Sequence, residues 1–291
     1  MRLLTILVCG AFCCAAAYAQ PSAKFDERSL QVSTLQRYYS AYVPVANTPD
    51  KPLLILLHGR LGTGRAIRAN AGTVFEQLAD REGFVIAYPD AMNRVWHDCR
   101  SAVEANTLTH TERVDDVGFL RALIKDAVAQ YRVDPGKVYL FGFSNGGAMA
   151  MRMAWEAPQD VSAIAVIAMN MPTEPTCQTN ARTPPVMFVA GTADTTVPYQ
   201  GGVVAFGGVV QSAPATAAAF GKANGLGQPD PESDVAALSS DPGAVRLLAW
   251  RRGGRPFVAL YTVKGGGHAI PVASQGVFDA PTMAWKFFRS E

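Results

Sequence analysis

The sequence predicts an α/β fold in which a mostly parallel sheet carries helices on both faces, in a single domain. Short apolar runs alternate along the chain with longer stretches whose apolar residues recur at helical spacing. Most of these short runs are continuous, as is typical of parallel strands buried on both faces. Strands that alternate with helices form parallel sheets, because each helix carries the chain back across one face.

The first third of the chain supplies the start of this pattern. Residues 37–44 alternate between apolar and polar side chains, as a half-buried strand does. Residues 51–59 and 83–90 are apolar runs, and a helix is expected between them at 68–82. The order strand, helix, strand predicts that the two buried strands lie parallel in one sheet.

The middle of the chain repeats the alternation. Apolar residues recur at helical spacing over 114–131, and the Pro and Gly within 132–137 end that helix. A strand is predicted at 138–144, and a helix at 145–158 that ends at its proline. A further buried strand follows at 161–169.

The last third completes the sheet. Residues 184–191 read as another buried strand. The segment 200–243 is rich in Gly, Ala, Pro and Ser, and we expect a long surface loop there with one helix at 212–224. Residues 244–263 are predicted to form a hairpin, and 276–289 a closing helix.

Composition and charge exclude several classes of protein. The 291 residues, 49% of them hydrophobic, suit one globular domain with a large core. The net charge is only +2 with Lys and Arg scattered, so we expect no nucleic-acid partner and no membrane partner. We find no metal-ligand spacing, G-x-G-x-x-G or P-loop, so no cofactor or metal is predicted. The oligomeric state is left open.

The N-terminus has the pattern of an export signal. Arg2 is followed by an apolar run, and the triplet from Ala17 to Ala19 forms a small-x-small cleavage site. We therefore expect residues 1–19 to be a signal peptide and residues 20–291 to be the mature domain, secreted or periplasmic. The alternative is an uncleaved membrane anchor, but the run is short for a bilayer span, which needs about 20 apolar residues.

Two cysteines, Cys99 and Cys177, remain after removal of the signal peptide. In an oxidising compartment such a pair can form a disulfide. Both follow predicted strands, so they could meet at the same edge of the sheet. The sequence leaves open whether they form a disulfide or remain two separate buried thiols.

Residues 142–146 read G-x-S-x-G and place Ser144 between a predicted strand and a predicted helix. A serine hydroxyl is a poor nucleophile unless a base removes its proton and the developing oxyanion is stabilised. A tight strand-to-helix turn points such a serine out of the sheet edge, and glycines remove the side chains that would collide there. We therefore predict that Ser144 is a catalytic nucleophile. The alternative is a packing turn in which Ser144 only caps the helix.

His268 and Asp194 are the predicted partners of this serine. In α/β-hydrolases the chain order is nucleophile, acid, histidine, and of the four histidines only His268 follows Ser144. Asp194 lies between them just after a buried strand, where its carboxylate could orient the imidazole. The alternative for His268 is an exposed loop histidine. Other acids lie in an irregular segment, where solvated charge is expected: Asp230, Glu232, Asp234 and Asp241.

Main-chain amides are expected to form the oxyanion hole. One should be that of Asn145, the residue after the nucleophile, and the other that of Arg60, in the loop after the strand that ends at "LLHG". His58 is then expected to hold this loop in place. A catalytic role for His58 is the less favoured alternative, because it breaks the chain order.

Five motifs together resemble secreted α/β-hydrolase esterases of the polyhydroxybutyrate depolymerase and feruloyl esterase type, related to carbohydrate esterase family 1. The resemblance spans nearly all of the mature chain. It implies that the serine of G-x-S-N-G-G, the aspartate of G-T-x-D and the histidine of G-G-G-H form a triad, here Ser144, Asp194 and His268. The motifs are "LLHGRLGTG", "DDVGFLRALI", "VDPGKVYLFGFSNGGAMAMRMA", "GTADTTVPYQGG" and "YTVKGGGHAIP".

Some positions depart from the family pattern. Arg60 stands where such enzymes often have a cysteine, and Leu226 and Trp250 stand where many have a cysteine pair, so that disulfide is not expected. Ile270 replaces a tryptophan after the catalytic histidine, which implies a different acyl or aromatic subsite. Trp96 matches a family tryptophan in the loop over the site and is expected to stack on substrate, with loop packing as the alternative.

These observations predict a secreted serine ester hydrolase that works through an acyl-enzyme, polyhydroxybutyrate depolymerase-like or feruloyl esterase-like. An acetylxylan esterase or a peptidase of the prolyl-oligopeptidase kind is the alternative. A non-catalytic binding protein on the same fold is disfavoured, because all three triad residues are present. The expected partner is an ester substrate, a polyester oligomer or a plant cell-wall ester.

Overall fold

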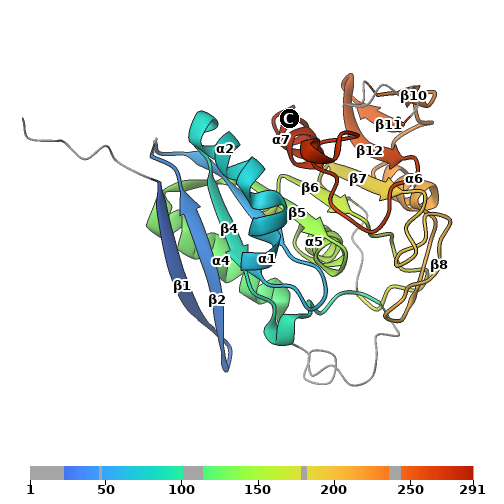
Figure 1. Ribbon diagram of the computed structural model, residues 1–291. Helices are drawn as coiled ribbons and strands as arrows, with labels where there is room; N and C mark the ends of the chain where they lie inside the picture. The colour runs from blue at the N-terminus through green and yellow to red at the C-terminus, as the bar shows by residue number, and fades with distance from the viewer. Residues whose placement is uncertain (1–22, 46–47, 101–113, 178–181, 236–243, 291) are drawn as a thin grey trace, which may run out of the picture.

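A ten-stranded sheet forms the centre of the computed structural model, which describes residues 23–45, 48–100, 114–177, 182–235 and 244–290 (Figure 1). Its strand order is β1-β2-β4-β3-β5-β6-β7-β12-β11-β10. In this order, the strands that run parallel to one another are β4, β3, β5, β6, β7 and β12. Antiparallel strands flank them at both edges. The predicted α/β class with a mostly parallel sheet is therefore confirmed.

The strands agree closely with the predicted apolar runs. In the parallel part they are β3 (Lys51–Leu57), β4 (Val85–Pro89), β5 (Val133–Phe143), β6 (Ala163–Ile167), β7 (Val186–Gly191) and β12 (Arg255–Val263). The antiparallel strands are β1 (Lys24–Val32), β2 (Leu35–Val43), β11 (Val245–Arg252) and β10 (Ser233–Asp234), and a separate small hairpin consists of β8 (Gly202–Val203) and β9 (Val209–Val210).

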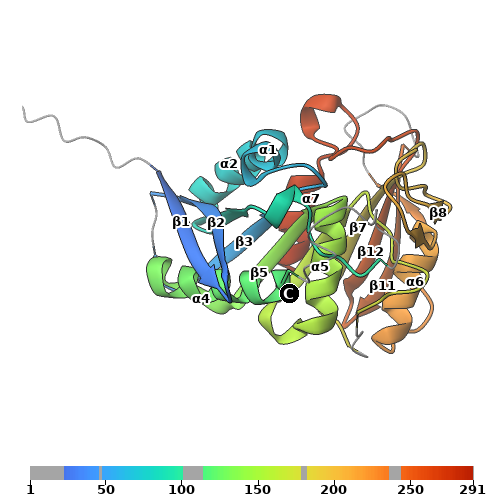
Figure 2. The ribbon, with the colours of Figure 1, turned by 90° about the horizontal axis from the view of Figure 1, so that it is seen from below.

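Helices cover both faces of the sheet (Figures 1 and 2). Successive residues of β3 contact opposite faces: Leu53, Ile55 and Leu57 belong to one apolar core, and Leu54 and Leu56 to the other. The first core is completed by α4 (Asp116–Tyr131), α5 (Asn145–Glu156) and α6 (Ala213–Ala223). The second is completed by α1 (Gly64–Ile67), α2 (Thr73–Glu82) and α7 (Ala280–Phe288).

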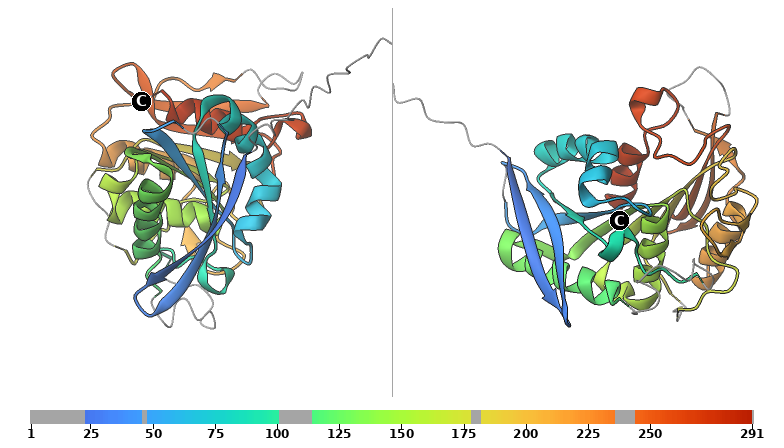
Figure 3. Two further views of the ribbon diagram at one scale, coloured as in Figure 1. Left: turned by 90° about the vertical axis from the view of Figure 1, so that its left-hand side faces the viewer. Right: turned by 60° about the horizontal axis from the view of Figure 1, so that its bottom comes forward.

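The β1–β2 hairpin differs from the prediction, which placed no strand before residue 37. Strand β1 pairs antiparallel with β2 and forms a ribbon at one edge of the sheet (Figure 3). Leu30 and Val32 pack against the core, whereas Glu27, Ser29 and Gln31 on the opposite face of β1 are polar and exposed. An edge strand needs only one apolar face, so its sequence does not show the continuous apolar run of a central strand.

The predicted helix at 68–82 is also divided differently. Helix α1 starts earlier, at Gly64, where the Thr63 side chain accepts a hydrogen bond from the amide of Ala66. A π-helical turn at Arg68–Gly72 then separates α1 from α2. π-Helical turns are frequent at functional sites.

The predicted signal peptide, residues 1–19, lies outside the described residues. Among the helices of the described part, none has the length and apolar character needed to cross a membrane.

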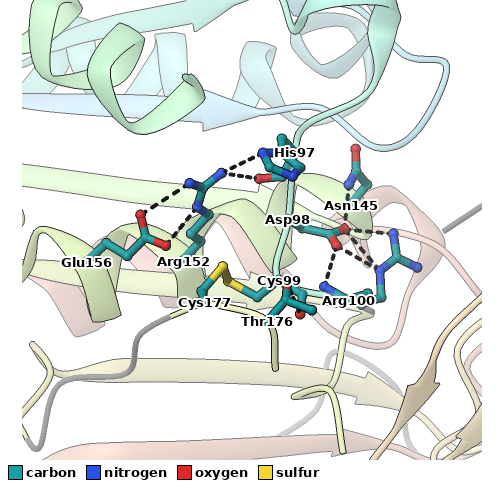
Figure 4. The surroundings of a disulfide bond; sticks show 9 residues. All are labelled: His97, Asp98, Cys99, Arg100, Asn145, Arg152, Glu156, Thr176 and Cys177. Atoms are coloured by element: carbon teal, nitrogen blue, oxygen red, sulfur yellow. Dashed lines mark hydrogen bonds and ion pairs between the residues drawn. A yellow bond between two sulfur atoms is a disulfide. The ribbon is translucent and has the colours of Figure 1, made fainter. Parts of the chain in front are cut away.

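A disulfide bond joins Cys99 to Cys177 (Figure 4). The sequence left this pairing open, and the structure decides in its favour. The bond links the segment after β4 to the segment after β6, which are 78 residues apart along the chain. Strands β4 and β6 are separated in the sheet by β3 and β5, so the disulfide cross-links segments that follow two non-adjacent parallel strands.

Removal of this disulfide should weaken the fold. We expect the double variant Cys99→Ser/Cys177→Ser to lose about 2–4 kcal/mol of unfolding free energy, because the unfolded chain regains the freedom of a long closed loop. Urea denaturation of oxidised wild type and of the variant measures the difference, and reduced wild type is the control. An unchanged unfolding free energy would contradict this role of the bond.

Candidate active site

Ser144 lies at the turn between β5 and α5, as the G-x-S-x-G pattern predicts. Its backbone has φ 53° and ψ −120°, a region that costs a residue with a side chain about 1–3 kcal/mol. The amide of Ser144 donates to the carbonyl of Ile167 at 2.8 Å, which anchors the turn on β6. A Cβ at Gly146 would lie 2.1 Å from the carbonyl oxygen of Leu57, so only glycine fits there.

The structure brings His268 and Asp194 to this serine. The Nε2 atom of His268 lies 3.0 Å from Ser144 Oγ, and its Nδ1 atom lies 2.8 Å from Asp194 Oδ2. The Asp194 side chain is 2% exposed, and that of His268 is 20% exposed. Three residues separated by 50 or more positions therefore form one continuous hydrogen-bonded chain that reaches solvent at its histidine.

Asp194 is held as a carboxylate. Burial by itself raises its pKa, but the hydrogen bond from His268 and those from two main-chain amides outweigh burial and lower the pKa below its ordinary value. These amides, of Thr196 and Val197, both donate to Oδ1 at 2.8 Å. A carboxylate only accepts hydrogen bonds, so Nδ1 of His268 carries the proton that it donates to Asp194. Nε2 then accepts from the hydroxyl of Ser144.

The loops that carry the acid and the histidine are tied to each other. The amide of Thr192 donates to the carbonyl of Val263 at 3.0 Å, and that of Ala193 donates to Gly266 at 2.9 Å. In the opposite direction, the amide of Gly265 donates to the hydroxyl of Thr192 at 2.8 Å. These bonds extend the pairing of parallel strands β7 and β12 beyond their ends, so the two loops leave the sheet together.

The two predicted oxyanion residues flank the serine. Asn145 is the first residue of α5, and the first amides of a helix have no partner within the helix. Arg60 lies in the turn after β3, and a Cβ at the preceding Gly59 would lie 3.4 Å from the Cβ of Ser144. The loop after β3 therefore passes beside Ser144. The guanidinium of Arg60 lies over the ring of Phe206, 5.1 Å from its centre.

Trp96 corrects the prediction that it stacks on substrate. Its side chain is 0% exposed, and its indole N–H donates to the carbonyl of His58 at 2.9 Å. The ring packs beside the imidazole of His58. The segment that holds Trp96 therefore supports the loop after β3 from within the protein. Trp96 thus has the alternative role that the sequence allowed, packing within a loop.

His58 itself holds its loop in place, as expected. Its Nε2 atom accepts from the amide of Ala91 at 3.1 Å, and its Nδ1–H donates to the carbonyl of Gly59 at 2.8 Å. Burial lowers the pKa of His58, so its imidazole stays neutral.

A cavity of about 260 Å³ opens beside His268. Sequence reasoning missed its lining, apart from Ile270, because nothing in the pattern places the π-helical turn next to the loop after β12. Polar and apolar groups both face it, so it can hold a substrate with a mixed surface. Besides His268, the lining residues are Asn70, Phe143, Ala269, Ile270, Val272 and Gln275.

Within the described part of the chain, Cys99, Glu156 and Cys177 are grouped closely enough to be considered as metal ligands. Both sulfur atoms are joined in the disulfide. They are therefore not thiolates, the form in which cysteine binds metals.

The strain at Ser144 predicts an order of stability for two variants of this residue. Ser144→Gly should exceed Ser144→Ala in unfolding free energy by about 1 kcal/mol, because glycine adopts this backbone conformation freely and both variants lack the hydroxyl. Thermal or urea unfolding of the two proteins measures the difference. Equal stabilities, or a more stable alanine variant, would show that the turn is not strained.

Comparison with known proteins agrees with this architecture. The esterase PHB depolymerase family matches residues 37–215, more than half of the chain. The chain is 32% identical over 172 residues to the putative esterase NocK of Nocardia uniformis subsp. tsuyamanensis, covering 59% of this chain and 46% of that protein. It is 29% identical over 247 residues to a feruloyl esterase B of Piromyces equi, covering 78% and 41%. It is also 33% identical over 151 residues to a poly(3-hydroxybutyrate) depolymerase of Ralstonia pickettii, covering 48% and 30%. The chain thus spans less than half the length of each of these relatives.

Solved structures of low identity share the fold. An acetyl xylan esterase from Aspergillus awamori superposes with a TM-score of 0.66 at 14% identity, covering 91% of this chain and all of that one. Esterase 2 of Thermogutta terrifontis, solved after phosphoramylation by tabun, gives a TM-score of 0.58 at 18% identity, covering 93% and 95%. The fold is therefore that of the α/β-hydrolases, and the chain belongs to the esterase PHB depolymerase family.

Proposed function

We propose that this esterase uses Ser144 as its nucleophile, His268 as its general base and Asp194 as the group that orients His268. The observation that carries the proposal is the position of the imidazole, 3.0 Å from the serine oxygen and 2.8 Å from the carboxylate. Nucleophile, base and orienting acid within hydrogen-bond reach are what activation of a serine requires.

The reaction follows from this geometry. Ser144 Oγ attacks the ester carbonyl while Nε2 of His268 takes the hydroxyl proton, and the carbonyl oxygen becomes an oxyanion. The imidazolium then protonates the leaving alcohol as the carbon–oxygen bond breaks, which leaves an acyl-enzyme on Ser144. His268 takes a proton from water as the water oxygen attacks this acyl group, then returns the proton to Ser144 Oγ as the bond between Oγ and the acyl carbon breaks, which releases the acid. Asp194 stabilises the imidazolium in both steps.

The amides of Asn145 and Arg60 are assigned to the oxyanion. They lie on the first turn of α5, directly after Ser144, and on the loop after β3, which passes close to Ser144. Main-chain N–H groups aimed at the developing charge stabilise it without reorganisation, and loss of one such donor costs about 10²-fold to 10³-fold in kcat.

The substrates we propose are esters of the kinds that name the relatives: hydroxyalkanoate oligomers, hydroxycinnamoyl esters and acetyl esters of plant polysaccharide. The cavity beside His268 is lined by both polar and apolar side chains, as such esters require. Export of the protein is part of the proposal. Its support is the Cys99–Cys177 disulfide, because disulfides form and persist in oxidising compartments.

Substitution of the three residues tests the proposed mechanism. Ser144→Ala, His268→Ala and Asp194→Asn should each lower kcat on p-nitrophenyl butyrate by about 10³-fold to 10⁴-fold, because each removes one part of the same unit. Asp230→Asn is the matched control, since Asp230 pairs with Arg251 on the surface, and its kcat should stay at the wild-type level.

Labelling with a fluorophosphonate gives a second measurement of the same proposal. Wild type should be modified at Ser144, as located by mass spectrometry of the labelled peptide, and Ser144→Ala should not react. A folded Ser144→Ala variant that keeps its esterase activity would refute the assignment.

A panel of esters then identifies the substrate class. We expect wild type, but not Ser144→Ala, to hydrolyse at least one of methyl ferulate, acetylated xylan and hydroxybutyrate oligomers, measured by release of the acid. A protein that labels at Ser144 yet cleaves only a peptide anilide would overturn the proposed ester substrate.

A further inference from the structure

We propose that the segment Val95–Arg100 is a positioning brace, which sets the two amides of the oxyanion hole relative to Ser144. The proposal rests on the proposed function above and assigns a role to the side chain of Asn145 in addition to its amide. Asn145 and Trp96 are positioning residues in this scheme, since their side chains act through the main chain and do not touch the substrate.

The side chain of Asn145 binds the main chain of Trp96 at two points. Its Oδ1 atom accepts from the Trp96 amide at 2.8 Å, and its Nδ2 atom donates to the Trp96 carbonyl at 3.0 Å. Nδ2 also donates to Asp98 Oδ2 at 2.7 Å (Figure 4). Asn145 is 1% exposed, so these bonds form away from water. An aspartate could not donate to the carbonyl and an aliphatic residue could make none of these bonds.

Trp96 links Asn145 to the loop after β3. Its indole N–H donates to the carbonyl of His58, the residue before Gly59 and Arg60. His58 in turn donates to Gly59 and accepts from Ala91, which holds the turn after β3. One continuous path of buried hydrogen bonds therefore joins the residue that supplies the first amide to the loop that supplies the second.

The far end of the brace is anchored by a buried ion pair. The guanidinium of Arg100 contacts Asp98 Oδ2 at 2.7 Å, and both side chains are nearly fully buried (Figure 4). Burial by itself raises the pKa of Asp98, but the charge of Arg100 and the hydrogen bonds to Asp98 outweigh burial and lower that pKa. Asp98 therefore stays a carboxylate that can hold Nδ2 of Asn145.

Neighbouring residues fix the brace to the body of the protein. The amide of His97 donates to Asp116 Oδ2 at 2.7 Å, and Asp116 forms a buried ion pair with Arg37 of β2. The carbonyl of His97 accepts from Arg152 of α5 at 2.7 Å, and Cys99 is joined to Cys177. The brace is therefore bound to α4, α5 and the segment after β6, and through Asp116 of α4 it is linked to β2.

Geometry explains why such a brace matters for catalysis. Oxyanion donors act when they lie about 2.7–3.1 Å from the tetrahedral oxygen, and a displacement of about 1 Å can cost about 10²-fold in rate. The two amides come from separate elements, so their spacing depends on what joins those elements. Loss of the brace should therefore weaken binding of the transition state more than binding of the substrate.

Asn145→Ala tests the brace, because it keeps the amide and removes the side chain. We expect kcat to fall about 10-fold to 100-fold, with KM changed less than about threefold, as for the loss of an interaction made in the transition state. The affinity for a trifluoromethyl ketone, which forms a tetrahedral oxyanion adduct on the serine, should fall in parallel with kcat/KM.

Asn224→Ala is the matched control. Asn224 is also buried, at the end of α6, and also makes three hydrogen bonds: it accepts from the Thr183 amide and donates to the Thr183 hydroxyl and to the Phe220 carbonyl. Both variants should lose similar unfolding free energy. Only Asn145→Ala should lose kcat and affinity for the ketone.

Trp96→Phe is a second variant, which keeps an aromatic ring and removes the N–H that donates to His58. It should lower kcat about threefold to tenfold, and its effect should not add to that of Asn145→Ala, because residues in one network are coupled. This variant decides the proposal if Asn145→Ala does not fold.

The outcomes separate this proposal from the proposed function. If wild type labels at Ser144 and hydrolyses esters, while folded Asn145→Ala or Trp96→Phe keeps wild-type kcat and ketone affinity, the brace is refuted and the serine mechanism stands. Equal losses of kcat in Asn145→Ala and Asn224→Ala would also refute it, since stability alone would then explain them. A wild type that neither labels nor hydrolyses esters overturns both.

Discussion

The site depends on the close approach of two main chains, the start of α5 and the end of β3. No side chain fits between them, since a Cβ at Gly146 would lie 2.1 Å from the carbonyl of Leu57. This approach turns the backbone sharply at Ser144 and brings the loop after β3 beside the serine. The positions of the proposed nucleophile and of both proposed oxyanion donors thus follow from one steric condition at the centre of the sheet, where packing on both faces leaves little room for adjustment.

The acid and the histidine reach the same place through the sheet. Strands β7 and β12 are parallel neighbours, so the loops that follow them leave at one edge, and hydrogen bonds between the loops continue the strand pairing. Asp194 and His268 therefore meet although 73 residues separate them along the chain. The long insertion between these strands carries α6 and the small hairpin, whose Phe206 ring lies beside the guanidinium of Arg60.

The sequence was sufficient for the parts of the structure that follow from periodicity and chain order. Continuous apolar runs located the central strands, and the order of Ser144, Asp194 and His268 selected three residues that the structure brings together. Strand β1 was not predicted, because an edge strand needs only one apolar face and therefore has no continuous apolar run. The side chain of Trp96 was predicted to face the substrate but is buried beneath the site. No sequence pattern tells whether a loop passes over a site or beneath it. The sequence could not decide whether Cys99 and Cys177 form a disulfide, because pairing depends on the distance between them in the folded protein.

The polar network beneath the site is better explained by alignment than by stability. A buried ion pair such as Asp98–Arg100 or Arg37–Asp116 contributes little net stability, because removal of both charges from water offsets their attraction. Apolar side chains could fill the same space, but they would not distinguish one alignment of the segment from a slightly shifted one. Directional hydrogen bonds to both the N–H and the C=O of Trp96 do distinguish them. Where two amides from separate elements must converge on one oxygen atom, a network that fixes their separation before substrate arrives removes the cost of reorganisation during the reaction.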